Sequence, residues 1–248
     1  MRDFVQSLWV GNRLSTMEQL AIRSFLHHGH EYHLYTYEPV ENLPPGTLEL
    51  HASAILPESA KFEYPGYKTF AGFSNFFRYK LLLEKGGWWV DTDVVCLAPF
   101  DFSTPYVFAS EHFFGAEVPA SAVLKTPSQC AAMQHAWDVC QSKNVAELTW
   151  GETGPQLVAQ VIERFSLEEY LRPASVFCPL APHEWRTVLE PNQSLTSLAG
   201  SHALHLWNEK WRHEECDKDA PFDFTCIYEQ LRRRYLSPVD DSKQAPVS

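Results

Sequence analysis

Basic residues are scarce in this sequence. The 248 residues include 20 Lys and Arg against 31 Asp and Glu, which gives a formal charge of −11. This excess of negative charge repels a polyphosphate backbone, so we do not expect a nucleic acid as a partner. An acidic protein that handles an anionic ligand needs a bound cation or a few well-placed arginines, and carboxylates gathered in one place would indicate a metal.

Long apolar runs and paired cysteines are also missing. No stretch approaches the roughly 18 apolar residues of a membrane span, and the first twelve residues have neither the charged nor the apolar region of a signal peptide. The six cysteines are scattered without a Cys-x-x-Cys pair, which argues against a disulfide framework or a zinc ribbon. We therefore expect a cytoplasmic protein. The three arginines Arg232 to Arg234 are also compatible with peripheral contact with an anionic membrane.

The sequence has no internal repeat and no linker rich in Pro, Gly or Ser. Hydrophobic residues make up 45% of the chain, enough for a substantial buried core. We therefore expect one domain over residues 1–236. The polar, Pro-containing residues 237–248 are expected to form a disordered tail.

Strand and helix patterns alternate along the chain. Apolar segments predict strands over residues 4–10, 32–37, 88–90 and 203–206. Ser15 and Glu18 have the spacing of a capping box, and Gly29 suits the end of the helix that follows. Further helices are expected over 74–85, 155–165 and 224–236. This alternation predicts an α/β fold with a mainly parallel central sheet, in which ligands bind beyond the carboxyl ends of the strands.

Two aspartates, Asp91 and Asp93, follow the apolar segment Trp88–Val90. Side chains alternate in extended backbone, so both carboxylates should point the same way, with Cα atoms about 6.5 Å apart. Apolar residues on both sides predict that the carboxylates are partly desolvated and raise each other's pKa unless a cation is bound. The pair therefore predicts a divalent-metal site.

Other uses of an Asp-x-Asp pattern fit less well. A calcium EF-hand loop starting at Asp91 would need an oxygen ligand, a glycine and a glutamate where Val95, Cys96 and Phe102 stand. Phosphatases of the haloacid dehalogenase type, with Asp91 as nucleophile, also need a later acidic pair at a strand end. The pair at residues 240–241 follows no strand, so a phosphatase remains the alternative.

The segment from Phe73 to Val94 resembles the signature of the DXD sugar transferases of glycosyltransferase family 32. The shared pattern is Asn-x-x-Arg-Tyr from Asn75, a helix, a Gly-Gly pair, an aromatic strand and Asp-x-Asp. Three more places resemble family motifs in the family's order: Leu8-Trp9-Val10-Gly11, Thr153-Gly154-Pro155 and His205-Leu206-Trp207-Asn208. Without the resemblance, Trp9 and His205 would be read as core residues and Arg78 as a solvated helix residue.

The resemblance implies a GT-A (Rossmann-like) fold and a metal-dependent, retaining hexosyltransferase. Such an enzyme moves a hexose from a nucleotide sugar, here expected to be a UDP-sugar, to an acceptor hydroxyl in glycan or polysaccharide biosynthesis. The implied metal ligands are Asp91, Asp93 and His205, with Mn²⁺ or Mg²⁺ as the cofactor; an imidazole among oxygen ligands favours Mn²⁺ over Ca²⁺. A catalytically silent nucleotide-sugar-binding protein is a further alternative.

The resemblance also implies donor contacts. Trp9 is expected to stack on the nucleobase and Arg78 to hold a phosphate or the sugar. Asn75 stands where the related motif has Asp, which removes a charge and leaves the preferred sugar open. The full implied donor set is Trp9, Gly11, Asn75, Arg78, Asp91, Thr153, Gly154, Trp207 and Asn208.

The polar candidates for the anomeric face are Glu152 and Gln156, which join Asp91 and Asp93 as the predicted catalytic residues. The departing phosphate itself is expected to take the acceptor's proton. A surface glycan, a lipid-linked oligosaccharide or a protein is compatible as acceptor. We expect the acceptor loops over residues 108–122 and 182–200.

Overall fold

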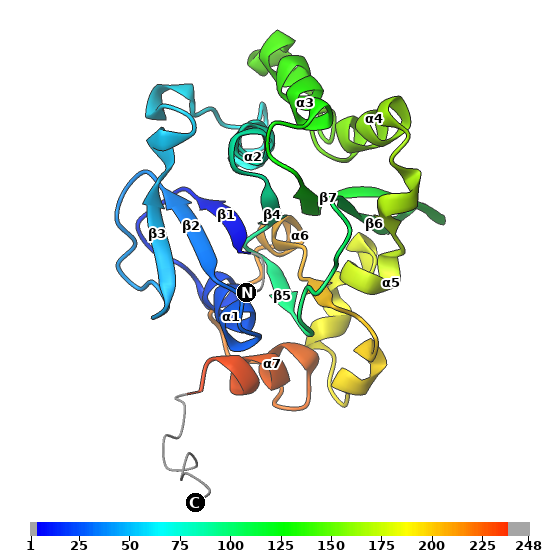
Figure 1. The fold of residues 1–248 in the computed structure, drawn as a ribbon. Coiled ribbons are helices and arrows are strands. Elements are labelled where there is room, and N and C mark those ends of the chain that lie inside the picture. The colour runs from blue at the N-terminus through cyan, green and yellow to red at the C-terminus, as the bar shows by residue number, and fades with distance from the viewer. Residues whose placement is uncertain (1–3, 238–248) are drawn as a thin grey trace, which may run out of the picture.

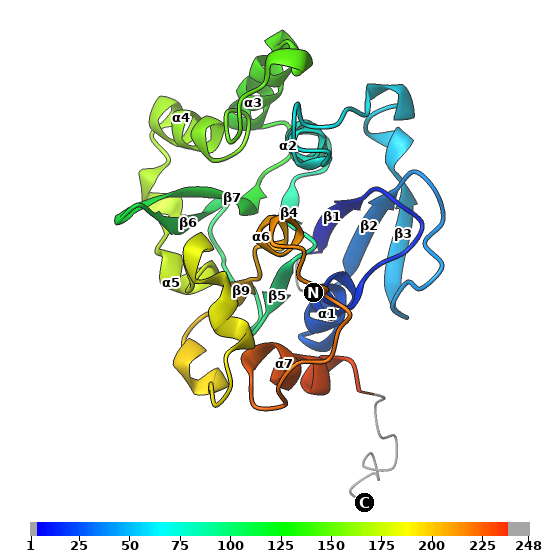
Figure 2. The same cartoon turned by 180° about the vertical axis from the view of Figure 1, so that it is seen from behind.

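The computed structural model describes residues 4–237, and helices cover both faces of its central sheet (Figures 1 and 2). Helices α2, α3 and α4 lie on one face, and α1 and α7 lie toward the other. The helices are α1 (Thr16–His27), α2 (Ala71–Lys85), α3 (Ala131–Ser142), α4 (Pro155–Phe165), α5 (Ala174–Phe177), α6 (Asn208–His213) and α7 (Ile227–Tyr235). The strands are β1 (Val5–Trp9), β2 (Tyr32–Thr36), β3 (Thr47–His51), β4 (Gly87–Val90), β5 (Val94–Cys96), β6 (Val107–Phe113), β7 (Ala116–Thr126), β8 (Leu171–Arg172) and β9 (Ala203–His205).

The central sheet has seven strands in the order β3-β2-β1-β4-β7-β6-β8. Strands β3, β2, β1 and β4 are mutually parallel, β7 is antiparallel to β4 and β6, and β8 is parallel to β6. The α/β fold with a mainly parallel sheet is therefore as predicted. Because β1 and β4 are parallel neighbours, their carboxyl ends, at Trp9 and Asp91, meet at one edge of the sheet.

Local sequence signals set several element boundaries. The Ser15 capping box forms in both directions at the start of α1, and Pro155 begins α4, which ends at Phe165 as predicted. Helix α2 begins at Ala71, earlier than the expected Ser74, and α7 covers only part of the predicted 224–236. The predicted disordered tail lies, from residue 238 on, outside the described residues.

The segment 108–122, predicted as an acceptor loop, is not a loop. It belongs to the hairpin of β6 and β7, which turns at Phe114 and Gly115, and β7 pairs with β4 as well as with β6. The backbone hydrogen-bonding groups of this segment therefore serve the sheet. The second predicted loop, 182–200, contains the 3₁₀ helices Pro182–Leu189 and Leu195–Leu198.

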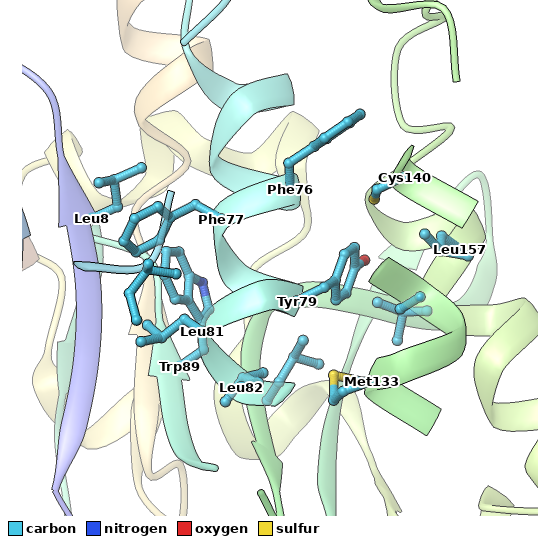
Figure 3. Packing of buried hydrophobic residues seen from close by; sticks show 14 of the residues in the cluster. Leu8, Phe76, Phe77, Tyr79, Leu81, Leu82, Trp89, Met133, Cys140 and Leu157 are labelled. Atoms are coloured by element: carbon cyan, nitrogen blue, oxygen red, sulfur yellow. The ribbon is translucent and has the colours of Figure 1, made fainter. Parts of the chain in front are cut away.

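Two hydrophobic clusters cover the two faces of the sheet. Trp88 and Trp89 are neighbours in β4 with exposures of 0% and 1%, and they point to opposite faces because side chains alternate along a strand. Trp89 packs with Phe77 of α2, while Tyr79 of the same helix faces α3 and α4 (Figure 3). Burying a side chain such as Phe77 contributes about 1.5–3 kcal/mol. The helix that carries Asn75 and Arg78 is thus fixed to the sheet.

A third cluster supports a separate two-stranded sheet of β5 and β9. It brings together side chains from α1, β5, β9 and α7, with Trp211 of α6 fully buried among them. In the part of the chain that the structure describes, the cysteines are free, and no helix combines the length and apolar character of a membrane span. The cluster fixes the strands that flank the Asp-x-Asp segment.

Candidate active site

Asp91 and Asp93 lie in the short connection between β4 and β5. The backbone turns there, since the N–H of Val94 donates to the carbonyl of Asp91 at 3.1 Å. The extended geometry predicted for this segment is therefore wrong. The turn nevertheless gathers the predicted ligands: Asp91, Asp93 and His205 each offer a ligand atom within 4.8 Å of the others.

His205 reaches the aspartates because β9 pairs with β5. Val94 and His205 are register partners, and the N–H of Leu206 donates to the Asp93 carbonyl at 2.9 Å. The His205 Nε2 lies 3.2 Å from Oδ2 of Asp93, and the side chain is 9% exposed. Burial alone would lower the pKa of His205, but the adjacent Asp93 carboxylate raises that pKa well above its ordinary value.

Asp93 also receives a backbone hydrogen bond from the start of α6. The N–H of Asn208 donates to Oδ2 at 2.7 Å, and the left-handed backbone of Trp207 (φ 59°) turns the chain into position for it. Burial would raise the pKa of Asp93, but His205 and this N–H lower it. The predicted mutual rise in pKa is therefore wrong for Asp93, since its charge is matched within the protein.

Asp91 is held by two donors. Its Oδ1 accepts hydrogen bonds from Nη2 of Arg78 at 2.6 Å and from Nε1 of Trp89 at 2.7 Å. Arg78 is only 2% exposed, and its guanidinium lies over the Trp89 ring at 4.9 Å. Burial raises the pKa of Asp91, while Arg78 opposes this rise. Arg78 therefore orients Asp91 as well as facing the ligand space.

Asn75 joins this network to the start of α4. Its Oδ1 accepts from Nη1 of Arg78 at 2.8 Å, and its Nδ2 donates to Oγ1 of Thr153 at 3.4 Å. A Cβ at Gly154 would lie 3.3 Å from Nδ2 of Asn75, so glycine permits this close approach. Tyr79 also donates to the Thr153 carbonyl at 2.9 Å. The Thr-Gly-Pro turn is thus anchored against α2.

These groups surround a cavity of about 750 Å³. Its lining includes the predicted residues Trp9, Asn75, Arg78, Asp91, Asp93, His205, Trp207 and Asn208. Gly11 does not line the cavity; it lies beside the buried edge of the Trp9 ring, since a Cβ there would lie 3.5 Å from the indole Nε1. Thr153 and Gly154 are buried behind Asn75. The structure therefore brings together the whole predicted donor set, in the lining or directly behind it.

The two predicted polar candidates for the anomeric face lie elsewhere. Glu152 is paired with Lys143 at 2.6 Å and accepts from the N–H of Thr149. Gln156 is exposed on the first turn of α4. Neither lines the cavity. Their proximity to the Gly-Pro turn along the chain does not aim their side chains at it.

Glu111 lines the cavity but was not predicted from the sequence. It extends from β6 toward the aspartates and His205, and burial raises its pKa to about 7. Phe113, two residues along the same strand, lines the cavity as well. A strand predicted over residues 107–113 would place the side chains of Glu111 and Phe113 on the same face, because side chains alternate along a strand. This alternation is the sequence signal that could have found Glu111.

The residues present fit a divalent metal ion. Carboxylate oxygens suit Mn²⁺ and Mg²⁺, and one imidazole is compatible with Mn²⁺. The Oδ2 atom of Asp93 already contacts the N–H of Asn208 and Nε2 of His205. Asp91, in contrast, keeps 26% of its side chain exposed. The site can therefore accept a cation in the cavity next to the buried Arg78.

Residues 30–112 match the protein family described as glycosyltransferase sugar-binding region containing DXD motif. The matched segment runs from just before β2 into β6 and includes Asn75, Arg78, Asp91 and Asp93, but not His205. The match confirms the prediction of a DXD-type glycosyltransferase and hence of a transferase enzyme. Membership of family 32 remains a prediction.

No curated protein matches the chain closely enough to count as a relative. Among solved structures, the PaToxG glycosyltransferase is similar at 14% identity, with a TM-score of 0.48 over 66% of this chain and 70% of that one. The apo form of glycosyltransferase GlyE from Streptococcus pneumoniae TIGR4 is similar at 13% identity, with a TM-score of 0.38 over 71% of this chain and 46% of that one.

Proposed function

We propose that this protein transfers a hexose from a UDP-sugar to an acceptor hydroxyl, with retention at the anomeric carbon, in glycan or polysaccharide synthesis. The observation that carries this proposal is one cavity that combines Asp91, Asp93 and His205 with the buried Arg78 and with Trp9. An acidic protein needs such a cation site to hold a diphosphate.

The nucleobase lies against Trp9 in this proposal. The Trp9 ring is half-buried at the end of β1 and lines the cavity, and within residues 4–237 its buried Nε1 has no hydrogen-bond partner. A flat aromatic face binds a base by stacking, which suits uracil. The indole N–H is closed off from the cavity, so the ring face is the part of Trp9 that serves the base.

Asp93, His205 and Asp91 would hold Mn²⁺ or Mg²⁺, with Mn²⁺ favoured by the imidazole. When bound, the ion supplies positive charge to the departing nucleoside diphosphate. Asn208 keeps Asp93 in place through its backbone N–H, and Trp207 packs on the His205 ring with centroids 3.9 Å apart and planes tilted by 38°. These contacts fix the ligand side chains before the donor enters.

Arg78 and Asn75 would bind the sugar and the phosphate next to it. The guanidinium is already oriented by Asp91 and Asn75, so it loses little freedom when a phosphate oxygen approaches. In this proposal the departing phosphate accepts the acceptor's proton, because no carboxylate is assigned as nucleophile. Glu152 and Gln156, predicted as catalytic from the sequence, do not line the cavity and have no role in this proposal.

A thermal-shift and turnover experiment tests the proposal. UDP at a hundred times its dissociation constant, with Mn²⁺, should raise the melting temperature by about 5–10 °C, and EDTA should remove most of that shift. A panel of nucleotide sugars with Mn²⁺ then identifies the donor by its hydrolysis or transfer. Asp93→Asn should lose both responses, whereas Asp138→Asn, exposed on α3, should keep them.

Three results would contradict the proposal. Full activity in Asp93→Asn would remove the metal site from the mechanism. Binding of UDP without turnover of any donor would indicate a silent nucleotide-sugar-binding protein. Hydrolysis of phosphate esters with Mg²⁺, through an acyl-phosphate on Asp91, would indicate the phosphatase alternative.

A further inference from the structure

A second aromatic surface lines the cavity, away from Trp9. Trp150 lies in the turn between α3 and α4, lines the cavity and keeps 44% of its surface exposed. Tyr67 lies beside it and is 45% exposed, with ring centroids 4.8 Å apart. Large aromatic side chains with this exposure gain free energy when a ligand covers them.

The surface is fixed from behind. Tyr64 is 2% exposed and packs on Trp150 with centroids 5.0 Å apart and planes tilted by 35°. The Tyr64 hydroxyl donates to the carbonyl of Thr149, next to Trp150 in the chain. The turn that carries Trp150 is therefore tied to the segment before α2, and the ring is held in place before any ligand arrives.

Trp150 and the proposed base site at Trp9 belong to different elements of the fold. Gly151 and Pro155 line the cavity on the same side, and Gly154 packs against Asn75, which belongs to the proposed sugar site. Trp9 instead stands at the end of β1. One nucleotide has a single base to stack, so the second aromatic surface is left for another ring at the sugar end.

The chemistry around Trp150 favours a saccharide. A pyranose has an apolar C–H face, which packs on the electron-rich face of an aromatic ring, and an edge of hydroxyls, which needs polar partners. Charged side chains line the same cavity, among them Lys68, Glu209 and Arg212. A lipid chain would desolvate these charges without giving them hydrogen-bond partners. A peptide can bind by adding a strand to a sheet edge, and neither outer strand of the seven-stranded sheet, β3 or β8, lines the cavity.

We propose that Trp150, supported by Tyr67 and Tyr64, is the acceptor subsite and that the acceptor is the sugar ring of a glycan. The inference rests on the proposed glycosyl transfer and selects one of the acceptor classes left open by the sequence. The sugar ring stacks on Trp150, and its reacting hydroxyl faces the donor site beside Asn75.

The subsite is tested with methyl glycosides of glucose, galactose, mannose and N-acetylglucosamine as acceptors. Trp150→Ala should raise the acceptor KM by about tenfold while the donor KM changes less than twofold, because only the acceptor loses its stacking surface. Trp150→Tyr should restore most of the affinity, which separates the loss of a ring from a disturbed turn. Phe224→Ala is the matched control, since Phe224 is 68% exposed and does not line the cavity.

A binding measurement keeps this inference separate from the proposed transfer. Saturation-transfer NMR on the same methyl glycosides should show contact with the wild type and with Trp150→Tyr, and little with Trp150→Ala. If no nucleotide sugar binds but this pattern appears, the proposed donor fails and the saccharide subsite stands. Equal binding and equal KM in Trp150→Ala, or transfer only to peptides, would overturn the subsite.

Discussion

The Arg78 side chain shows how one residue can serve both folding and ligand binding. Its guanidinium is almost fully buried and donates to Asp91 and Asn75, while the cavity lies on its remaining side. Burying a charge requires a partner, and Asp91 supplies it. The neutral Asn75 fills the second position without adding a second negative charge, so the pair of charges is balanced.

Removing Arg78 should therefore destabilise the fold. We expect Arg78→Ala to lower the free energy of unfolding by about 3–5 kcal/mol, because the Asp91 carboxylate is left without its cation. Urea denaturation measures the loss. Arg212→Ala is the control: its pair with Glu209 is exposed, so the loss there should be about 0–1 kcal/mol. Similar losses in the two variants would show that the Arg78 pair contributes no more than a surface pair.

His205 should make the folding stability of the metal-free protein fall as pH rises. Its folded-state pKa is raised above the unfolded value, so the stability it contributes is fully present below the unfolded pKa and is lost as pH rises through the folded pKa. In EDTA, the stability of the wild type relative to His205→Asn should fall from pH 6 toward higher pH. Urea denaturation at several pH values measures this difference. His183→Asn, at an exposed position, should show the same dependence of stability on pH as the wild type. If the stability difference between the wild type and His205→Asn does not change with pH, the role given to His205 is wrong.

The sequence was sufficient to predict which residues meet but not how their charges are matched. Asp91, Asp93 and His205 come together as expected. The lowered pKa of Asp93 depends on the N–H of Asn208, whose direction is set by the left-handed turn at Trp207. Neither contact leaves a periodic signal in the sequence. Glu152 similarly faces Lys143 because of local pairing that spacing alone does not reveal.

The link between α2 and β4 determines where the helix of Arg78 sits relative to the strand that leads to Asp91. Gly86 closes α2 with φ 65° and ψ −159°, a conformation that only glycine adopts readily. A Cβ there would lie 2.4 Å from the backbone nitrogen of Ser128. The strand and the helix are therefore joined in a way that leaves no room for a side chain.

Gly86→Ala should lower the free energy of unfolding by at least about 3 kcal/mol, from backbone strain together with the clash at Ser128. Gly115→Ala is the control, because Gly115 also has a positive φ, at 80°, but a Cβ there meets nothing within 4 Å. This variant should lower the free energy of unfolding by only about 1–2 kcal/mol. Chemical denaturation of the two variants checks the difference, and equal losses would mean that the close approach to Ser128 relaxes without cost.

Elements with strong local signals were predicted well, and elements defined by distant partners were not. The capping box of α1 and the Gly-Pro start of α4 depend on neighbours in the chain. The sequence over residues 108–122 predicts a loop because the pairing of β7 with β4 leaves no local signal. Residues 94–95 appear in the sequence only as an apolar flank because the partner of β5 is the distant β9. Pairing across long sequence separations carries no short-range pattern.

The net charge of −11 acts at the scale of the whole molecule. A negative protein attracts a divalent cation over distances comparable with the screening length, and salt shortens that length from about 30 Å at 0.01 M to about 10 Å at 0.1 M. Binding of Mn²⁺ should therefore weaken as NaCl rises, in the absence of nucleotide. Titration calorimetry at several salt concentrations measures this trend; an affinity independent of salt would assign binding to the local ligands alone.

The strand order of the central sheet bears on protein engineering. The matched family region, residues 30–112, contains β4 but neither of its sheet neighbours, since β1 precedes the region and β7 follows it. Excised, the region would expose both edges of an apolar strand that is fully paired in the whole chain. A chimera that exchanges sugar specificity between such transferases therefore has to carry β1 and β7 along with the Asp-x-Asp segment.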